Sequence, residues 1–221
     1  MNKKPEIIIF DWDGTLVKDD ITFDTFYKTM HEMRDLKLEH IDEAMLVEYR
    51  YYPMRDSLKL IFGDNAQRFE KQYLENISNE QFVPPIQMNG AIDALNYFRE
   101  NNVEMFIVSN KRDVTLRKEI SYLGWEEYFS AIVGASEAQR GKPWRDPVDL
   151  ALSVVQNPEK KQKWFIGDSV VDIRCAHETE CVPFLINPKY DTEQLIKESG
   201  LDHVRIDSHE CLIKKYKEYS A

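Results

Sequence analysis

Cysteine is scarce in this sequence, and its spacing argues against the two commonest roles of paired thiols. There are three among 221 residues, Cys175, Cys181 and Cys211, and they form no Cys-x-x-Cys pair. A disulfide framework usually has an even number of cysteines, and a structural zinc site needs four suitably spaced ligands. The composition therefore favours a reducing compartment, and we expect a cytoplasmic protein.

Long apolar runs and excess positive charge are also missing. The N-terminal apolar run, 7–10, is too short for the core of a secretory signal, and no stretch approaches the roughly 18 apolar residues of a membrane span. Lys and Arg number 29 against 39 Asp and Glu, which gives a formal net charge of −10. We therefore expect no membrane partner and no binding to nucleic acid duplexes, because duplex binding requires a basic surface.

What the sequence does contain is a series of short apolar segments without polar alternation. This pattern is typical of strands that are covered on both faces, as in parallel sheets. The expected strands are Glu6–Phe10, Val103–Val108, Ala131–Val133, Trp164–Ile166, Val182–Ile186 and, more weakly, His203–Ile206. Helical segments are expected at Ala91–Glu100, Val114–Leu123, Val148–Val155 and Val170–Glu178. The alternation predicts an α/β fold with a Rossmann-like, doubly wound parallel sheet.

One long segment interrupts this alternation. Residues 20–82 contain no strand-like run but carry helical periodicity, with polar breaks near 39–41, at Pro53 and at 63–65. Pro84 and Pro85 then form a stiff return to the α/β pattern. We predict an α/β core domain made of 1–18 and 84–221, with a small all-helical domain, 19–83, inserted after the first strand.

Polar residues follow four of the expected strands. Ligands of open α/β sheets bind at the carboxyl ends of the strands, so these turns are the candidate site. They are Asp11-Trp12-Asp13-Gly14-Thr15, Ser109-Asn110-Lys111, Gly141-Lys142-Pro143 and the segment 167–172, Gly-Asp-Ser-Val-Val-Asp. Two carboxylates as close as Asp11 and Asp13 repel each other unless a cation lies between them.

Taken together, the four turns resemble the four motifs of the haloacid dehalogenase superfamily of aspartate-dependent phosphohydrolases. They occur in the family's order, and the resemblance covers nearly the whole chain. The helical insertion lies where some members carry a helical cap, between the first and second motifs. The resemblance implies a phosphatase that requires Mg²⁺, a cation that prefers carboxylate, carbonyl and phosphate oxygens.

The resemblance also implies a role for each motif residue. Asp11 would attack phosphorus and form an aspartyl-phosphate, while Asp13 would protonate the leaving oxygen and then activate water. The metal ligands would be Asp11, the main-chain carbonyl of Asp13, and Asp168. Ser109, the main-chain N–H of Asn110, and Lys142 would hold the phosphoryl oxygens. Asp13 favours phosphate-ester chemistry, because haloacid dehalogenases and phosphonatases lack an aspartate there.

Some residues have a structural interpretation beside the functional one. Asp172 follows Ser169 at the spacing of a helix capping box. The resemblance implies instead that Asp172 lies next to the metal ligands without binding the metal directly, or that it orients Lys142. Thr15 is expected to fix the geometry of the first loop. Arg50 and Arg55, in a tyrosine-rich stretch of the insertion, are candidates for substrate specificity or for a solvated helix end. Trp144 and Arg145 could line the mouth of the site.

The sequence therefore predicts a Mg²⁺-dependent phosphatase that acts on a small phosphorylated metabolite, as a monomer or a dimer. A sugar phosphomutase would use the same active site and stays an open alternative. A receiver-like signalling domain also combines a phospho-accepting aspartate with an acidic cluster and a lysine, but such a module needs about half this length. A catalytically silent interaction protein is the remaining alternative, and the complete motif set argues against it.

Overall fold

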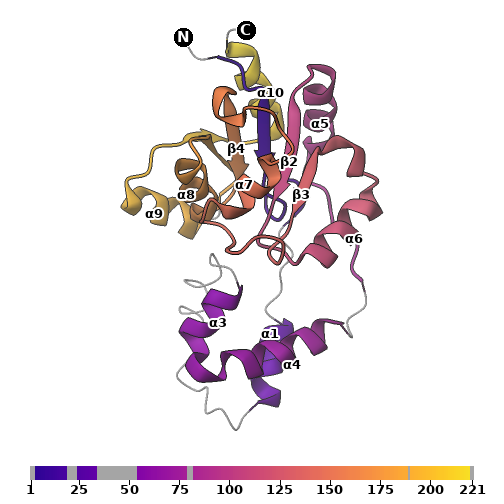
Figure 1. The fold of residues 1–221 in the computed structure, drawn as a ribbon, viewed down its shortest axis with the longest axis vertical. Coiled ribbons are helices and arrows are strands. Elements are labelled where there is room, and N and C mark those ends of the chain that lie inside the picture. The colour runs from indigo at the N-terminus through magenta and orange to yellow at the C-terminus, as the bar shows by residue number, and fades with distance from the viewer. Residues whose placement is uncertain (1–2, 19–23, 34–53, 79–81, 189, 220–221) are drawn as a thin grey trace. The chain divides into compact units, whose positions relative to one another are not determined.

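The structure is a computed structural model, which describes residues 3–18, 24–33, 54–78, 82–188 and 190–219 (Figure 1). The chain divides into two compact units, residues 1–19 with 84–221 and residues 20–83. Among the described residues, no helix is both long and apolar enough to cross a bilayer.

The first unit is built on a six-stranded, entirely parallel sheet. Its strands are β1 (Ile7–Phe10), β2 (Glu104–Val108), β3 (Ala131–Val133), β4 (Lys163–Gly167), β5 (Val182–Ile186) and β6 (Val204–Ile206). Their order across the sheet is β3-β2-β1-β4-β5-β6. The order reverses between β1 and β4, which is where ligands of such sheets bind. Phe10 pairs with Ile107 of β2 and with Ile166 of β4, so the chain leaves three adjacent strands at one level.

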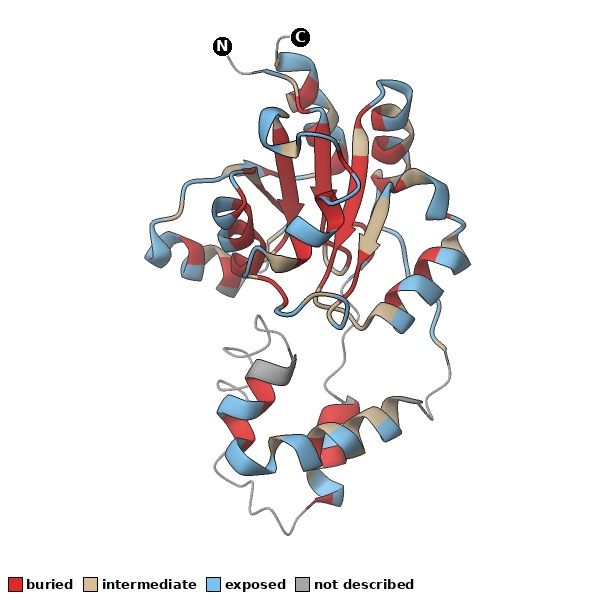
Figure 2. Ribbon diagram, viewed as in Figure 1, coloured by how far each residue is buried: buried red, intermediate tan, exposed pale blue. Residues whose placement is uncertain are grey.

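Helices cover both faces of this sheet (Figure 1). They are α5 (Ala91–Glu100), α6 (Asp113–Leu123), α7 (Asp146–Leu152), α8 (Val170–Glu178), α9 (Tyr190–Ser199) and α10 (His209–Glu218). Figure 2 shows the inner strands β1, β2 and β4 almost entirely buried, and the helices buried on one side only. The uninterrupted apolar strands of the sequence are therefore explained by cover on both faces.

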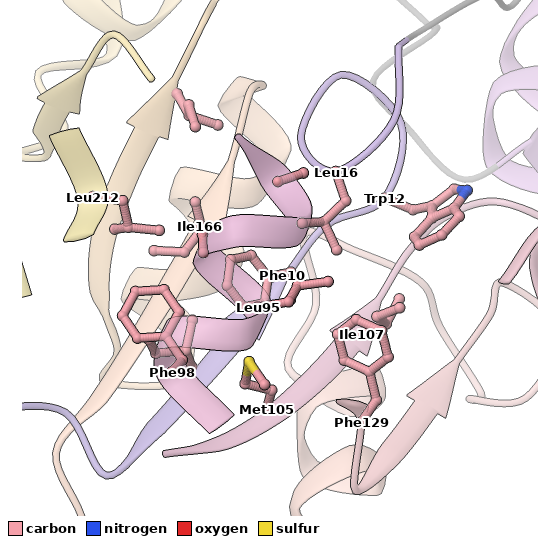
Figure 3. Packing of buried hydrophobic residues seen from close by; sticks show 14 of the residues in the cluster. Phe10, Trp12, Leu16, Leu95, Phe98, Met105, Ile107, Phe129, Ile166 and Leu212 are labelled. Carbon is pink, nitrogen blue, oxygen red and sulfur yellow. The ribbon is translucent and has the colours of Figure 1, made fainter. Parts of the chain in front are cut away.

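The residues of β1 alternate between two hydrophobic cores. Ile8 and Phe10 belong to a cluster with residues of α5, α6 and α10. Figure 3 shows Phe10, Leu95 and Leu212 of this cluster. Ile7 and Ile9 belong to a second cluster with residues of α7 and α8. Because all four β1 side chains are fully buried, the strand that carries the first motif is fixed from both sides.

The second unit is helical in its described part. It contains α1 (Asp24–Glu32), α3 (Met54–Phe62) and α4 (Ala66–Ser78), with a short 3₁₀ turn at Gly63–Asn65. Its core is largely aromatic: Phe26 lies 4.9 Å from Phe69, and Phe69 stacks on Phe62 at 4.0 Å between ring centroids. Leu58, Ile61 and Met33 complete this cluster.

The predicted fold class is confirmed, with shifts at the ends of elements. Four of the six strands differ from the expected bounds, each by one residue at one or both ends. The helix expected at Val148–Val155 is Asp146–Leu152, so it begins two residues earlier and ends three residues earlier. The helix expected at Val114–Leu123 begins one residue earlier, at Asp113, which accepts a hydrogen bond from Ser136. Helices α9 and α10 were not anticipated.

Candidate active site

The first and fourth turns follow β1 and β4, the strands that flank the switch point, and the second turn follows β2. The Asp11 N–H donates to Ile166 O of β4 at 2.9 Å, and the Ser109 N–H donates to Val133 O of β3 at 3.0 Å. These bonds extend the sheet pairing by one residue into the first and second turns. Beyond Asp11 the chain turns sharply, with Leu16 N–H donating to Trp12 O at 2.9 Å.

Gly14 lets this turn approach the fourth motif. Its φ of +77° lies in the left-handed region, and a Cβ added there would stand 2.2 Å from Asp168 Oδ2. A side chain at position 14 would therefore collide with the Asp168 carboxylate and also strain the backbone. The glycine of the first motif is what allows Asp168 to lie against the loop that carries Asp11.

Lys142 lies between two carboxylates in the interior of the site. Its Nζ is 2.6 Å from Asp11 Oδ1 and 2.6 Å from Asp172 Oδ1, and all three side chains are buried. Burial by itself would lower the pKa of Lys142, but the two carboxylates outweigh it and raise that pKa. Burial raises the pKa of Asp11 to about 7, although Lys142 acts in the opposite direction. The ammonium group is thus a fixed cation beside Asp11.

Asn110 holds the backbone of Lys142 on both sides. Its Oδ1 accepts from the Lys142 N–H at 2.8 Å, and its Nδ2 donates to the Lys142 carbonyl at 3.0 Å. The sequence suggested a role for the main-chain N–H of Asn110, but not this one for its side chain. An asparagine amide can accept from the N–H and donate to the carbonyl of one residue, but nothing in the sequence indicated which residue it faces.

Asp172 combines the two roles that the sequence left open. Its Oδ2 accepts from the Ser169 N–H at 3.1 Å and from the Ser169 hydroxyl at 2.5 Å, which begins α8 with a capping box. Its other oxygen, Oδ1, binds Lys142. The helix cap therefore also sets the direction of the lysine.

Three carboxylates are close enough to share a cation. Asp11, Asp168 and Asp172 each offer one oxygen, and these oxygens lie within 4.8 Å of one another. Hard divalent cations prefer such oxygen ligands, so the residues present fit Mg²⁺. In the described part of the chain no other group of three or more His, Cys, Asp or Glu residues meets this criterion. Cys175 instead donates to Trp144 O, at 3.4 Å.

The remaining polar residues of the turns are buried or paired. Ser109 Oγ accepts from the Lys111 N–H at 3.1 Å, and Ser109 is buried. Thr15 is fully buried, and its hydroxyl has no hydrogen-bond partner among the described residues. Lys111 Nζ lies 2.8 Å from Asp13 Oδ1 and 2.9 Å from Glu119 Oε1, a pairing that the sequence analysis did not foresee.

The other candidates from the sequence were Trp144 and Arg145 for the mouth of the site, and Arg50 and Arg55 for substrate specificity. Trp144 is half-exposed under the guanidinium of Arg140, at 4.5 Å from the ring centroid. Arg145 is paired with Asp149 at 2.7 Å, one helical turn further on. Arg50 lies outside the described residues, and Arg55 belongs to α3, where its side chain is not described.

Comparison with known proteins gives one consistent result. Residues 8–185 match the family model described as haloacid dehalogenase-like hydrolase. The pyrophosphatase PpaX of Listeria monocytogenes is 23% identical over 188 residues, covering 81% of this chain and 82% of the relative. The phosphoglycolate phosphatase of Aquifex aeolicus is 26% identical over 175 residues, with 77% and 79% covered.

Two solved structures show the same fold over almost the whole chain. A haloacid dehalogenase-superfamily hydrolase from Ehrlichia chaffeensis is 27% identical, covers 99% of this chain and 98% of its own, and superposes with a TM-score of 0.65. A haloacid dehalogenase-like family hydrolase from Streptococcus pneumoniae is 21% identical, with 95% and 97% covered and a TM-score of 0.71. The family model spans most of the sheet and all four turns, and the chain belongs to the haloacid dehalogenase-like hydrolases.

Proposed function

We propose that this hydrolase is a Mg²⁺-dependent phosphatase, which cleaves a small phosphorylated metabolite through an aspartyl-phosphate on Asp11. The observation that carries the proposal is the buried Lys142, held 2.6 Å from Asp11 inside a cluster of carboxylates. A phosphate monoester is a dianion and repels an anionic nucleophile. A fixed cation beside Asp11 reduces that repulsion and matches the negative charge on the transferring group.

Two steps follow from this arrangement. An oxygen of Asp11 attacks phosphorus, the bond to the leaving oxygen breaks, and Asp13 gives its proton to that oxygen. Asp13 then takes a proton from a water molecule, whose oxygen attacks the phosphorus of phospho-Asp11. Inorganic phosphate leaves, and both aspartates return to their starting states.

The phosphoryl oxygens would be held by Ser109, the main-chain N–H of Asn110, and Lys142. The side chain of Asn110 is already committed to the Lys142 backbone, which supports a positioning role for it. Asp11, Asp168 and the main-chain carbonyl of Asp13 would hold Mg²⁺. When bound, the cation supplies the charge neutralisation that three neighbouring carboxylates and a phosphate need.

We further propose that residues 19–83 act as a cap that selects the substrate, with Arg50 and Arg55 as candidates to bind a distal anionic group. The names of the relatives point to pyrophosphate and phosphoglycolate as the first compounds to try. Both are small and carry a second anionic group, for which an arginine is a suitable partner.

The test is hydrolysis of 4-nitrophenyl phosphate with Mg²⁺ and again with EDTA, followed by a metabolite panel scored by released phosphate. We expect turnover that requires the metal and is lost in Asp11→Asn. An undiminished rate in that variant, or in EDTA, would contradict the proposal. Transfer of the phosphoryl group to a sugar in place of water would identify the phosphomutase alternative.

A further inference from the structure

We propose that Lys111 is a positioning residue for Asp13, and that Glu119 anchors it. The inference rests on the proposed function, because it concerns the carboxylate that exchanges protons with the leaving oxygen and with water. It gives a role in the site to Lys111, a residue of the second turn, and to Glu119 of α6, for which the sequence indicated none.

The contacts form a closed ring. Lys111 Nζ bridges Asp13 Oδ1 at 2.8 Å and Glu119 Oε1 at 2.9 Å. The other Glu119 oxygen, Oε2, accepts from the indole Nε1 of Trp12 at 2.6 Å. The ring thus begins at residue 13, passes through the second motif and α6, and returns to residue 12.

Each member of the ring is attached to a rigid part of the fold. Lys111 lies three residues after the end of β2, and Glu119 lies in the middle of α6 and is buried. Trp12 is fully buried and meets Trp125 edge-on, with 5.9 Å between ring centroids. The charge-assisted bonds to Asp13 are therefore fixed by packing that lies away from the reacting atoms.

This rigidity matters for a carboxylate with two tasks. A lysine ammonium can donate to one carboxylate oxygen while the other oxygen carries the proton to and from the reacting groups. A displacement of about 1 Å in such a group can cost about 100-fold in rate. Without Lys111, the Asp13 carboxylate loses the hydrogen bond that sets its orientation. The rate of the first step then falls only for substrates whose leaving group must be protonated.

A purely structural role is the competing explanation. A buried indole N–H needs an acceptor, and Glu119 supplies one whether or not it serves the chemistry. That role predicts weaker folding and an equal loss on every substrate. The positioning role predicts a loss that grows with the basicity of the leaving group.

Two aryl esters of similar size separate these explanations. Phenyl phosphate releases phenolate, whose conjugate acid has a pKa near 10 as in tyrosine, whereas 4-nitrophenolate is far less basic and leaves without a proton. The value of kcat/KM reports the steps through departure of the leaving group. We expect Lys111→Met to lower kcat/KM for phenyl phosphate by about 10- to 100-fold, and that for 4-nitrophenyl phosphate by less than about 3-fold.

Three further variants complete the design. Lys111→Arg keeps a cation and should recover part of the lost activity on phenyl phosphate. Glu119→Gln keeps an acceptor for the Trp12 indole but removes one anchor of Lys111, so it should show the same selectivity to a smaller degree. Lys118→Met, on the exposed side of α6, is the matched control and should retain both activities.

The outcomes decide the inference. Equal losses on the two esters, or no loss, would overturn it while the unmodified protein still hydrolyses both with Mg²⁺. If Lys111→Met fails to fold by circular dichroism, selective loss in Lys111→Arg and Glu119→Gln supports the inference, and its absence overturns it. If the unmodified protein cleaves neither ester, the proposed function itself is wrong.

Discussion

At the scale of single residues, two lysines pair with three carboxylates of the site. Lys142 pairs with Asp11 and Asp172, and Lys111 pairs with Asp13. Each pair is largely removed from water, where an unpaired charge would be costly. The site therefore holds several paired charges in a closely packed interior, where they serve the reaction but contribute little to the stability of the fold.

Replacing Asp11 tests whether the buried site disfavours the ionised form of this carboxyl group. Burial raises the pKa of Asp11 to about 7, so between about pH 4 and 7 the folded protein binds more protons at this group than the unfolded chain. Stability from this group is present at low pH and is lost as the pH rises through that window. In EDTA at pH 8, we expect Asp11→Asn to be more stable than the unmodified protein by roughly 1 kcal/mol or more.

The measurement is urea unfolding as a function of pH. The difference should disappear near pH 4, where Asp11 is protonated and resembles asparagine. Adding Mg²⁺ should stabilise the unmodified protein, by roughly 2 to 3 kcal/mol at a hundred times the dissociation constant, and should affect the variant less. A less stable Asp11→Asn at pH 8 would show that ionised Asp11 is not disfavoured by the fold.

Gly14 and Gly124 form a matched pair for a second prediction. Both have positive φ, +77° and +68°, but a Cβ at Gly14 meets Asp168 at 2.2 Å, whereas a Cβ at Gly124 meets nothing within 4 Å. Gly124→Ala should cost about 1 kcal/mol in stability and leave kcat unchanged. Gly14→Ala should lose at least about 100-fold in kcat/KM, because it displaces a carboxylate of the acidic cluster.

Activity and thermal unfolding of both variants provide the check. Similar activities for the two would mean that the close approach of Gly14 to Asp168 does not matter for the reaction.

At the scale of secondary-structure elements, α10 is attached to the segment before α5 through a buried histidine. His209 is fully buried at the start of the helix, and its Nδ1 is 3.2 Å from the Asn89 carbonyl. Ser208 caps the helix by accepting from the Cys211 N–H at 3.2 Å. Burial lowers the pKa of His209 to about 4, so the folded state holds the imidazole neutral.

A loss of stability in mild acid follows from this burial. Between about pH 6.5 and 4 the unfolded chain binds a proton at His209 that the folded chain does not, so the stability from this group is lost as the pH falls through that range. The full difference amounts to roughly 3 kcal/mol. His209→Gln should flatten this part of the stability profile, and His203→Gln, at an exposed position, should not. An unchanged profile in His209→Gln would contradict the assignment.

The elements also show what the sequence could reveal. The strands were predictable because apolar runs without polar alternation, such as that of β1, are typical of strands covered on both faces. The turns were predictable because their residue types together suit one chemistry. The Asn110 clamp and the Lys111–Glu119 pair were not, since each joins residues whose proximity depends on how α6 and the turns pack. Helix α10 has a signal in the sequence, Ser208 before the apolar pair Leu212 and Tyr216.

At the scale of the whole molecule, each of the two units has its own hydrophobic core. Phe69 is fully buried in the helical unit, and Phe98 is fully buried in the α/β unit. Replacing either by alanine should cost about 3 to 5 kcal/mol, but in different parts of the chain. Phe69→Ala should raise amide exchange in α1, α3 and α4 while α5 and the sheet stay protected.

Phe98→Ala is the matched control and should reverse this pattern, with exchange rising in α5 and the strands. Exchange measured by mass spectrometry reports both units in one experiment. If Phe69→Ala increased exchange equally in both units, they would have to unfold as one.

The position of β1 has a consequence for how the protein is made. The first strand to leave the ribosome is central in the sheet, and one of its two neighbours, β4, ends at residue 167. At about 5 to 20 residues per second, roughly 8 to 30 seconds pass between the synthesis of the two strands. During that time the apolar segment Ile7–Phe10 has no complete sheet to join, while the whole helical insertion has already been translated. Pairing of β1 on its β4 side must therefore wait until the chain has been made to residue 167.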